Sequence, residues 1–428
     1  MDALIAVDAG RHSQAALTWT LDGNDKDARG GALIGPERGL CTELVYGTLR
    51  HARRLDAWIT TASDRGLLDL DAATHAALRI GAYQLAGLDK IPEFAALNAT
   101  VEAAKGRVPN ARVGYVNAVL RRLAREAPWL AAPQPALLPP WQVRALTAFV
   151  ADLGVEADAV VDAHASPAPL HVHVVTPSRA GAVAEFAADG VEVSRVAALP
   201  GVYAIGAGAF FDSTAYRRRA AIAQDAASAA ITEWVGAAPN LRVADVCAGR
   251  GAKSLFLAAS GAEVDALDVD DDKLVEAAEL VRSAGFALHR TAVADVAMHM
   301  PLQAESYDAV LVDAPCSGLG TLRRRPEIGH RRRMTDVLRL STLQAAILRN
   351  AATLVRPGGA LVYAVCTFTA EEGAGVVDAF LSDNPAFARD DARPAWLQGW
   401  CDGKGDLRSH PLIEGADLFY AARLIRRS

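Results

Sequence analysis

Two cysteines and a carboxylate stand where predicted strands end in loops. The apolar run 307–312 leads into the motif DAPCSG, which holds Asp313 and Cys316, and the apolar run 360–365 leads into Cys366. At the carboxyl edge of an open parallel sheet, such positions line the ligand site. Addition of a thiolate to a cytosine ring activates a carbon that is otherwise a poor nucleophile. The pair therefore favours catalysis on a pyrimidine, whereas either thiol alone is more often a small buried apolar group.

A glycine-containing segment, VADVCAGRGAK at 243–253, runs from a predicted strand into a predicted helix. Gly249 and Gly251 permit a tight turn and a close approach of the backbone to a ligand, and the helix start favours an anionic group. Asp268 ends the next predicted strand, where a carboxylate can hydrogen-bond ribose hydroxyls. Asp295, after the third strand, is placed to meet the adenine end of a nucleoside.

These strand-end residues favour one nucleoside cofactor over another. The chain contains neither the phosphate-binding pattern GxxxxGK[ST] nor a full GxGxxG. An adenosyl group without a pyrophosphate, as in S-adenosylmethionine, therefore fits better than NAD. The alternative is a plain strand–helix turn without a ligand, in which Asp268 is an ordinary helix cap.

Arginines crowd into one short stretch after the Cys316 loop, although the chain as a whole has a net charge of −6. Arginine forks suit phosphate, and a cluster can bind a nucleic-acid backbone despite an acidic average. A solvated surface is the alternative. The predicted phosphate-binding residues are Arg323, Arg324, Arg325, Arg331 and Arg332, and Arg217, Arg218 and Arg219 form a second cluster.

The N-terminal part of the chain predicts an all-helical bundle. Residues 37–126 contain four apolar faces at helical spacing, and prolines between 128 and 140 then predict a linker. The first 36 residues give no clear assignment. The four faces consist of Leu55, Trp58 and Ile59; Leu78, Gly81, Ala82 and Leu85; Phe94, Leu97, Val101 and Ala104; and Val116, Val119, Leu120 and Leu123.

The remaining chain predicts a small α+β insert and then an α/β domain. The insert has helices over 141–153 and 179–189 and strands over 170–175 and 191–193. From about residue 220 strands and helices alternate, which predicts a mostly parallel sheet with helices on both faces. The predicted strands are 242–246, 263–268, 287–293, 307–312, 360–366 and 418–425, the helices are 252–260, 271–284, 335–355 and 371–382, and PGG at 357–359 is a turn. The expected domains are 1–130, 131–205 and 206–428.

The cysteine pattern and the lengths of the apolar runs indicate in which cellular compartment the protein is expected. Five cysteines without a CxxC pair make a disulfide framework or a zinc site unexpected, and a reducing cytoplasm fits best. Cys41 and Cys401 are expected to be structural. The amino terminus lacks the features of a signal peptide, and no apolar run approaches the length of a membrane span. We therefore expect a cytoplasmic monomer without metal or membrane contact.

Several motifs together resemble the NOL1/NOP2/Sun family of RNA cytosine-5 methyltransferases. DAPCSGLG followed by RRRPEI resembles the family's first cysteine motif, RPGG with VYAVCT resembles the second, and AQDAAS at 223–228 resembles the stretch before the cofactor strand. ELVYGTLR, AYQL and VNAVLRR in the helical part look like the NusB-like RNA-binding domain of the family's RsmB (Sun) branch. The resemblance extends from about residue 37 to the carboxyl end.

The resemblance implies a NusB-like helical bundle, a small α+β insert and a Rossmann-like class I methyltransferase. Its cofactor would be S-adenosylmethionine, and its substrate one cytosine of 16S ribosomal RNA. By position, Cys366 would attack C6 of the base, Cys316 would assist release, and Asp313 would lie between cofactor and base; if protonated, it could donate to N3. The methionine part of the cofactor would meet Cys247, Ala248, Gly249, Arg250, Gly251, Ala252 and Lys253, with Asp268 at the ribose and Asp295 near the adenine.

The chain departs from the family pattern at several places. The family's CAAPGGK loop has Gly249, Arg250 and Ala252 at three of its positions, and the usual TCS around the nucleophile is VCT. His173 stands where the family has an arginine that would contact RNA, and Gly329-His330 replaces Arg-Trp. Two alternatives follow: a non-catalytic RNA-binding ribosome assembly factor with a drifted cofactor loop, and a DNA cytosine-5 methyltransferase that uses Cys316 as its nucleophile.

Overall fold

The computed structural model describes residues 1–22, 33, 35–175, 179–196 and 199–427. These residues form two compact units. The first comprises Met1–Val143 together with two short segments from later in the chain, His164–Ser166 and Leu322–Arg331, and the second comprises Arg144–Ala163, Pro167–Thr321 and Arg332–Ser428. The segment after the Cys316 loop therefore belongs to the N-terminal unit, although it lies within the sequence of the α/β part.

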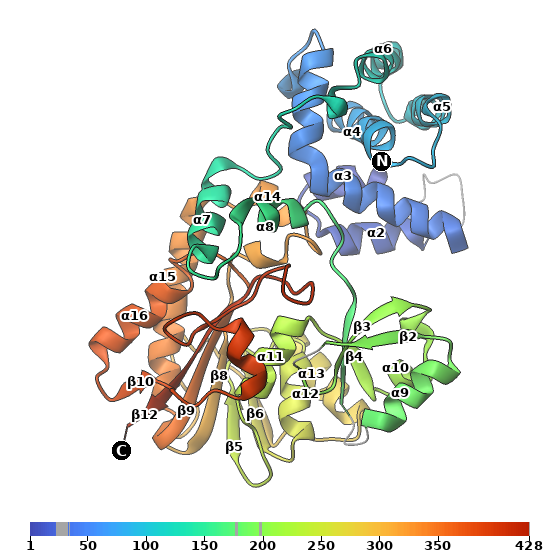
Figure 1. Cartoon of the computed structure of the whole chain (residues 1–428). Helices are drawn as coiled ribbons and strands as arrows, with labels where there is room; N and C mark the ends of the chain where they lie inside the picture. The colour runs from blue at the N-terminus through green and yellow to red at the C-terminus, as the bar shows by residue number, and fades with distance from the viewer. Residues whose placement is uncertain (23–32, 34, 176–178, 197–198, 428) are drawn as a thin grey trace. The chain divides into compact units, whose positions relative to one another are not determined.

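The first unit is helical, as the sequence predicts (Figure 1). Its core is built from the predicted apolar faces. Leu55, Leu78 and Leu120 are fully buried in one cluster. Asp71 begins the fourth helix by accepting a hydrogen bond from the backbone N–H of Thr74. The helices are α1 (Asp2–Asp8), α2 (Ser13–Leu21), α3 (Gly35–Ala62), α4 (Ala72–Gly87), α5 (Glu93–Ala104), α6 (Asn110–Glu126) and α14 (Glu327–Arg331), with the 3-10 turns η1 (Leu67–Asp69) and η2 (Pro128–Leu130).

Two details of this unit differ from the sequence prediction. Phe94, predicted to lie on a buried face, is 69% exposed, because it sits in the first turn of α5, ahead of Leu97, which reaches the core. The first residues of the chain, which gave no assignment, form α1 and α2. Leu4 and Leu17 from these helices pack with Leu49 of α3 in a second cluster. Weak amphipathic patterns in short helices become clear only when the partner helix is known.

The second unit begins with a small layer of helices and antiparallel strands. Its four strands follow the order β2-β3-β1-β4, and Val172, Phe186 and Phe210 lie in its core. The two predicted strands and two predicted helices are confirmed, whereas α8, β3, α10, β4 and α11 were not predicted. The elements are α7 (Pro140–Val150), α8 (Ala157–Ala163), β1 (His171–Val174), α9 (Arg179–Ala188), β2 (Glu192–Arg195), β3 (Val202–Ala207), η3 (Phe210–Asp212), α10 (Thr214–Arg217), β4 (Ala221–Ala223) and α11 (Ala226–Trp234).

The larger sheet confirms the predicted α/β alternation. Its order is β10-β12-β9-β8-β5-β6-β7, with β11 paired to β12. The strands from β9 to β7 run parallel, and β10 to β12 add an antiparallel edge. The elements are β5 (Arg242–Asp245), α12 (Ala252–Ala259), β6 (Glu263–Asp268), α13 (Asp271–Ser283), β7 (Arg290–Val293), β8 (Tyr307–Asp313), η4 (Leu319–Thr321), α15 (Met334–Ala352), β9 (Val355–Val365), α16 (Ala374–Asp383), β10 (Phe387–Arg389), η5 (Ala395–Trp400), β11 (Leu407–Arg408) and β12 (Tyr420–Arg426).

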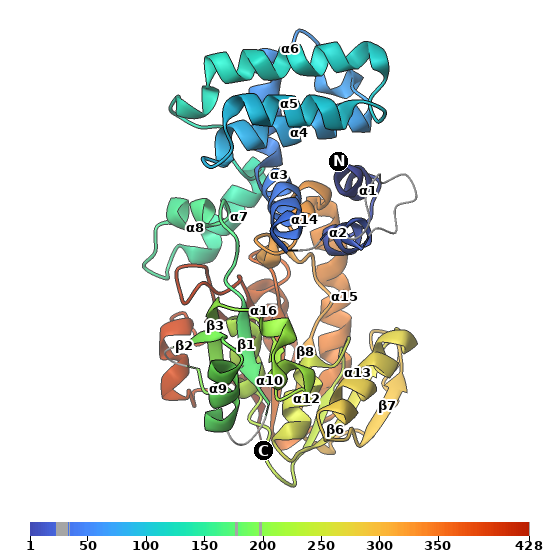
Figure 2. The ribbon, with the colours of Figure 1, turned by 90° about the vertical axis from the view of Figure 1, so that its right-hand side faces the viewer.

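Alternation along the central strands sends side chains to both faces of this sheet. Leu311 and Val362 pack in the cluster that includes Leu255 of α12 and Val281 of α13, while their neighbours along the strands are buried on the opposite face. Figure 2 shows α12 and α13 on the near side of the strands and α15 behind them. The PGG segment, predicted as a turn, lies within β9, where the pairing with β8 shifts register.

Candidate functional site

The register of the two central strands brings the predicted cysteines together. Asp313 pairs with Ala364 in the parallel β8–β9 ladder, so Cys316 and Cys366 follow at the same edge of the sheet. Their sulfur atoms lie 3.2 Å apart. The contact with Cys366, then burial, then the negative charge of Glu372 raise the pKa of the Cys316 thiol well above its usual range. Cys316 therefore keeps its proton at neutral pH.

A close backbone contact fixes the spacing of the two cysteine loops. The N–H of Gly320 donates to the carbonyl oxygen of Cys366 at 2.9 Å, and the carbonyl of Gly320 accepts from the N–H of Leu418 at 3.0 Å. A Cβ at Gly320 would overlap the carbonyl oxygen of Leu418 and lie 2.9 Å from the carbonyl carbon of Cys366. Only glycine fits between these two backbone segments.

Lys253, on α12, lies beside the predicted carboxylate. Its Nζ donates to Oδ2 of Asp313 at 2.6 Å, although the lysine side chain is only 8% exposed. Burial opposes the charge, but Asp313, Asp245 and Cys366 more than offset it and raise the pKa of Lys253. The ammonium is therefore stable next to both Asp313 and Cys366, and it supplies a positive charge and a proton at the edge of the sheet.

The glycine loop follows β5 as predicted, and its two glycines have different surroundings. Gly251 has φ 80° and precedes α12 as its N-cap, and a Cβ there would lie 2.6 Å from the Cβ of Ala277. Gly249 has φ 53°, and nothing lies within 4 Å of the position of its absent Cβ. Gly251 is thus required by packing, whereas Gly249 leaves bare backbone at the edge of the sheet.

Asp245, the last residue of β5, carries a buried carboxylate with an unused acceptor. One oxygen accepts a hydrogen bond from the hydroxyl of Ser254 at 2.7 Å, and the other has no partner among the described residues. Burial, partly offset by Ser254, raises the pKa of Asp245 to about 6. A buried carboxylate oxygen without a donor is suited to an incoming ammonium group. The loop therefore fits the amino-acid part of S-adenosylmethionine.

The other two predicted carboxylates lie along the same edge, Asp268 at the end of β6 and Asp295 just after β7. Asp268 accepts hydrogen bonds from the backbone N–H groups of Gly249 and Asp270, at 2.9 and 3.0 Å. Asp295 accepts one from the N–H of Ala297 at 3.1 Å. An ionised carboxylate has about four acceptor sites, so both side chains retain acceptors for a hydroxyl or an amine.

Three further residues of the glycine loop, Cys247, Arg250 and Ala252, have different surroundings. Arg250 is exposed and forms an ion pair with Glu276 on α13. Ala252 begins α12 and packs against the core below the sheet edge. Burial raises the pKa of the Cys247 thiol well above its usual range, which makes this cysteine unreactive. The positive charge that Arg250 brings to the loop is thus already paired with a carboxylate.

Four of the five arginines predicted to bind phosphate have partners within their own units. Several of their guanidinium groups donate to backbone carbonyls, which is a structural use of arginine donors. Arg324 is half-buried and Arg325 is exposed. In the first unit, Arg323 donates to Ser166, Arg325 contacts His12, and Arg331 donates to Gly10 and Arg11; in the second unit, Arg332 donates to Ser317 at 2.9 Å.

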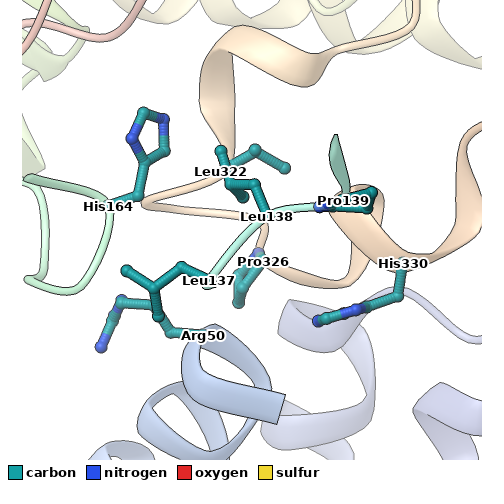
Figure 3. A pocket seen from close by; sticks show the side chains of 9 residues that line it. Arg50, Leu137, Leu138, Pro139, His164, Leu322, Pro326 and His330 are labelled. Carbon is teal, nitrogen blue, oxygen red and sulfur yellow. The ribbon is translucent and has the colours of Figure 1, made fainter. Parts of the chain in front are cut away.

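A small pocket lies where the segment 322–331 meets helix α3 of the same unit (Figure 3). Arg50, His164 and His330 line it together with apolar side chains such as Leu322. Its volume is about 20 Å³, room for about one water molecule. The pocket is thus too small for a nucleoside.

Sequence reasoning missed a buried residue that touches the cysteine loop. Glu372 is fully buried and accepts hydrogen bonds from Ser317, Gln344 and Thr369. Its position in the sequence, in the first turn of the helix predicted over 371–382, is one where acidic residues are common on exposed surfaces. No pattern in the sequence separates this glutamate from its exposed neighbour Glu371.

Among the described residues, no helix is long and apolar enough to cross a bilayer. In the same residues, no group of three or more histidine, cysteine, aspartate or glutamate side chains could hold a metal ion.

Comparison with known proteins supports a single family. The family model of the 16S rRNA methyltransferases RsmB/F matches residues 234–425, and the NusB family model matches residues 1–125. Ribosomal RNA small subunit methyltransferase B of Thermus thermophilus is 35% identical over 432 residues, which cover 99% of this chain and 96% of that protein.

Solved structures share the fold. The crystal structure of PH0851 has a TM-score of 0.79 at 24% identity and covers 99% of this chain and 96% of its own. The structure of NSun6 from Pyrococcus horikoshii with SFG has a TM-score of 0.57 at 16% identity, over 68% of this chain and 98% of its own. With a relative of 35% identity along nearly its whole length, the chain belongs to the RsmB (Sun) branch of the NOL1/NOP2/Sun methyltransferase family.

Proposed function

We propose that this protein methylates carbon 5 of a cytosine in small-subunit (16S) ribosomal RNA, with S-adenosylmethionine as the methyl donor. The observation that carries the proposal is the pair of thiols 3.2 Å apart at the sheet edge, next to the Lys253–Asp313 pair. The Thermus relative is named as a methyltransferase of small-subunit ribosomal RNA, and NSun6 was crystallised with SFG. These names support the classes of substrate and cofactor.

Residues of the glycine loop would hold the cofactor. The free oxygen of Asp245 and the bare backbone at Gly249 would receive its amino-acid part, and Asp268 its ribose. Asp295 would lie toward the adenine. When bound, S-adenosylmethionine supplies a methyl group attached to a positively charged sulfur.

Cys366 would be the nucleophile. Its thiolate forms a bond to C6 of the cytosine, and the electrons of the C5–C6 double bond make C5 nucleophilic. Lys253 and Asp313 hold a proton that can pass to N3 and stabilise the adduct. After C5 has gained the methyl group, the Cys316 thiolate removes the C5 proton. The double bond re-forms, Cys366 leaves with the electrons of the C–S bond, and the N3 proton returns to the Lys253–Asp313 pair.

The charges around the two sulfurs support this division of labour. The ammonium of Lys253 lies near Cys366, since that cysteine contributes to the raised pKa of the lysine. The carboxylate of Glu372 lies on the side of Cys316 and raises the pKa of that thiol. Negative charge is therefore disfavoured on Cys316 while both thiols are free, which leaves Cys366 as the proposed attacking atom.

For the RNA backbone we propose phosphate contacts from the arginine cluster, Arg324 and Arg325 first. These two are the arginines of the 323–325 run that are not buried. Arg323 and Arg331, of the same unit, already donate to backbone carbonyls, but a guanidinium has five donors, so they can add to the same phosphate surface. Arg332, in the second unit, donates to Ser317 and has donors left for a phosphate contact of its own. The target base must leave its stack to reach the thiols.

A covalent-trapping experiment tests the proposal. Cys316→Ala protein is incubated with 16S ribosomal RNA and S-adenosylmethionine, and adducts are separated on denaturing gels. We expect an RNA–protein adduct to accumulate, because the base that removes the C5 proton is missing. The double variant Cys316→Ala, Cys366→Ala should form none.

Unchanged methyl transfer by Cys316→Ala without any adduct would refute the assigned roles. Single-stranded DNA of the same sequence serves as the competing substrate. An adduct formed through Cys316 on DNA would instead support a DNA cytosine-5 methyltransferase. Calorimetric titration with S-adenosylmethionine separates the enzyme from a non-catalytic assembly factor, which would not bind the cofactor.

A further inference from the structure

Glu372 occupies a position between the two cysteine loops that no step of the proposed reaction yet uses. One of its carboxylate oxygens accepts from the backbone N–H of Ser317 at 2.7 Å and from Nε2 of Gln344 at 3.0 Å. The other accepts from the hydroxyl groups of Ser317 and Thr369, at 2.5 and 2.9 Å. All four partners are donors, which is the environment of an ionised carboxylate.

These contacts join the Cys316 loop to the Cys366 loop. Ser317 follows Cys316 directly, and its hydroxyl also lies 3.0 Å from the hydroxyl of Thr367, the residue after Cys366. Gln344, from α15, donates to the carbonyl of Pro315 at 2.9 Å as well as to Glu372. The residues on both sides of Cys316 are thus tied, directly or through Gln344, to one buried carboxylate.

The backbone on both sides of Cys316 is consequently held by side chains. The carbonyl of Ser317 accepts from Nε of Arg332 at 2.9 Å, while its N–H donates to Glu372, and the carbonyl of Pro315 accepts from Gln344. A loop that is bonded on both sides of Cys316 allows little movement of its sulfur. Because proton removal from carbon needs the base at a defined distance, a fixed sulfur is what the release step requires.

The charge of Glu372 acts on the same sulfur. The titratable and charged groups around Cys316 are Cys366 and Tyr363 from the β9 end, Glu372 from the loop before α16, and Arg332 from the segment before α15. Tyr363 is neutral, because burial raises its pKa well above the usual range. Glu372 is therefore the nearby anion that persists once Cys366 is bound to the base.

We propose that Glu372 is the positioning residue of the release step: its buried carboxylate fixes the Cys316 loop against the Cys366 loop and opposes negative charge on Cys316 while both thiols are free. The inference rests on the proposed function. Before RNA binds, Cys316 stays a thiol and does not compete as nucleophile. In the adduct it loses its proton to solvent and becomes a base strong enough to take the C5 proton.

Two substitutions separate position from charge. In Glu372→Gln the side-chain oxygen can still accept from Ser317 N–H and Gln344, and the amide can donate to the hydroxyl groups of Ser317 and Thr369, so the loops stay joined without the charge. Glu372→Ala removes the hydrogen bonds that join the two cysteine loops. Glu371→Gln, an equal change of charge at the exposed neighbour, is the matched control.

The readout is the rate at which the RNA adduct resolves, measured from pH 6 to pH 10. For the wild type this rate rises with pH, because Cys316 must lose its proton. In Glu372→Gln we expect the midpoint to move down by about one pH unit, since a like charge near the thiol has been removed. Glu372→Ala should accumulate adduct as Cys316→Ala does. A midpoint unchanged in Glu372→Gln, or shifted equally by Glu371→Gln, overturns the proposal.

A second measurement keeps this inference separate from the proposed reaction. The pH dependence of alkylation of Cys316 by iodoacetamide is followed by mass spectrometry in RNA-free protein that carries Cys366→Ala. Glu372→Gln should again lower the midpoint relative to Glu371→Gln. A shift in alkylation together with no adduct in Cys316→Ala would reject the adduct chemistry and the role of Glu372 in release, while the charge effect of Glu372 would stand; no shift in alkylation rejects the charge effect itself.

Discussion

The cysteine loop after β8 and the glycine loop after β5 lie at the same edge of the sheet but are held in opposite ways. Around Cys316, side chains bond the neighbouring backbone groups, as the buried Glu372 and the half-buried Arg332 do for Ser317. In the glycine loop, one oxygen of Asp245 has no partner and the backbone at Gly249 is bare. The backbone groups beside Cys316 already have partners within the protein. The glycine loop, in contrast, retains a hydrogen-bond acceptor and space that a ligand can use.

This difference explains which departures from the family pattern the chain tolerates. The DAPCSGLG motif is kept in full, and its Gly320 admits no side chain. Arg250, in contrast, is a new residue in the glycine loop and reaches an exposed partner, Glu276. A loop that is packed from all sides restricts its sequence, whereas a loop that borders open space restricts only the positions that touch the core, such as Gly251.

The largest effect is expected from a side chain added at Gly320, in the Cys316 loop. Gly320→Ala forces its Cβ onto the carbonyl of Leu418 and against Cys366, so the two cysteine loops must separate. Overpacking of this kind costs about 1–3 kcal/mol of folding free energy. Methyl transfer should fall below detection, while cofactor affinity, measured by calorimetry, stays within a few-fold.

The matched control for this substitution is Gly399→Ala, at an exposed position where nothing lies within 4 Å of the added Cβ. It should leave both the melting temperature and methyl transfer unchanged. If Gly320→Ala retained full activity, the spacing of the two thiols would not depend on this close contact.

A smaller but still large loss is expected where the two loops meet. Lys253→Met removes the ammonium beside Asp313 and Cys366 while keeping a long apolar side chain in the same place. Without this proton donor, turnover should fall by about 100-fold, a typical contribution of acid–base catalysis. Single-turnover kinetics should assign the loss to adduct formation, and equal rates for variant and wild type would remove Lys253 from the mechanism.

The same contrast shows how much of the site could be predicted from the sequence. Asp313, Cys316 and Cys366 were placed correctly at one sheet edge, because strand-end position in a parallel sheet is a local property that motifs reveal. The α/β alternation and the helical bundle followed from periodicity for the same reason. The three-domain division stays a prediction.

What the sequence did not reveal are contacts between distant segments. Glu372 and Lys253 act through partners that lie 55 and 60 positions away in the chain, and no local pattern marks such pairs. The arginine run illustrates the same limit. Its spacing predicts a phosphate surface, but the partners of Arg323 and Arg331 within the first unit come from segments more than 150 and 300 residues away. Side-chain contacts of this kind depend on the tertiary fold.

In the glycine loop, substitution of Asp245 should have a moderate, pH-dependent effect on cofactor affinity. An ammonium group binds the ionised carboxylate, so cofactor affinity of the wild type should increase as the pH rises through about 6, the pKa of Asp245. Asp245→Asn should bind the cofactor about 10-fold more weakly at pH 8, the loss expected for one charge-assisted hydrogen bond, and should lack this pH dependence. Calorimetry at pH 5.5 and pH 8 measures both.

Asp245 also affects stability with a definite sign. Its pKa is raised on folding from 3.8 to about 6, so the folded state holds a proton that the unfolded state loses first. This contribution is present below pH 4 and is lost as the pH rises from about 4 to about 6, by about 3 kcal/mol. The difference in unfolding free energy between Asp245→Asn and the wild type should therefore move in favour of the variant over this range. A constant difference would mean that the carboxyl does not titrate there.

The smallest effect is expected at the residue that departs most visibly from the family loop. Arg250→Ala removes an exposed ion pair with Glu276, and surface pairs contribute little to stability because water and salt screen them. Cofactor affinity and methyl transfer should both stay within about two-fold of the wild type, since such substitutions usually change free energies by less than about 0.5 kcal/mol. Gly251→Ala, one position away, should weaken cofactor binding far more, because its Cβ meets Ala277. If Arg250→Ala instead lost cofactor affinity like Gly251→Ala, the guanidinium would have to leave Glu276 for the ligand, and the open loop would be restricted as tightly as the cysteine loop.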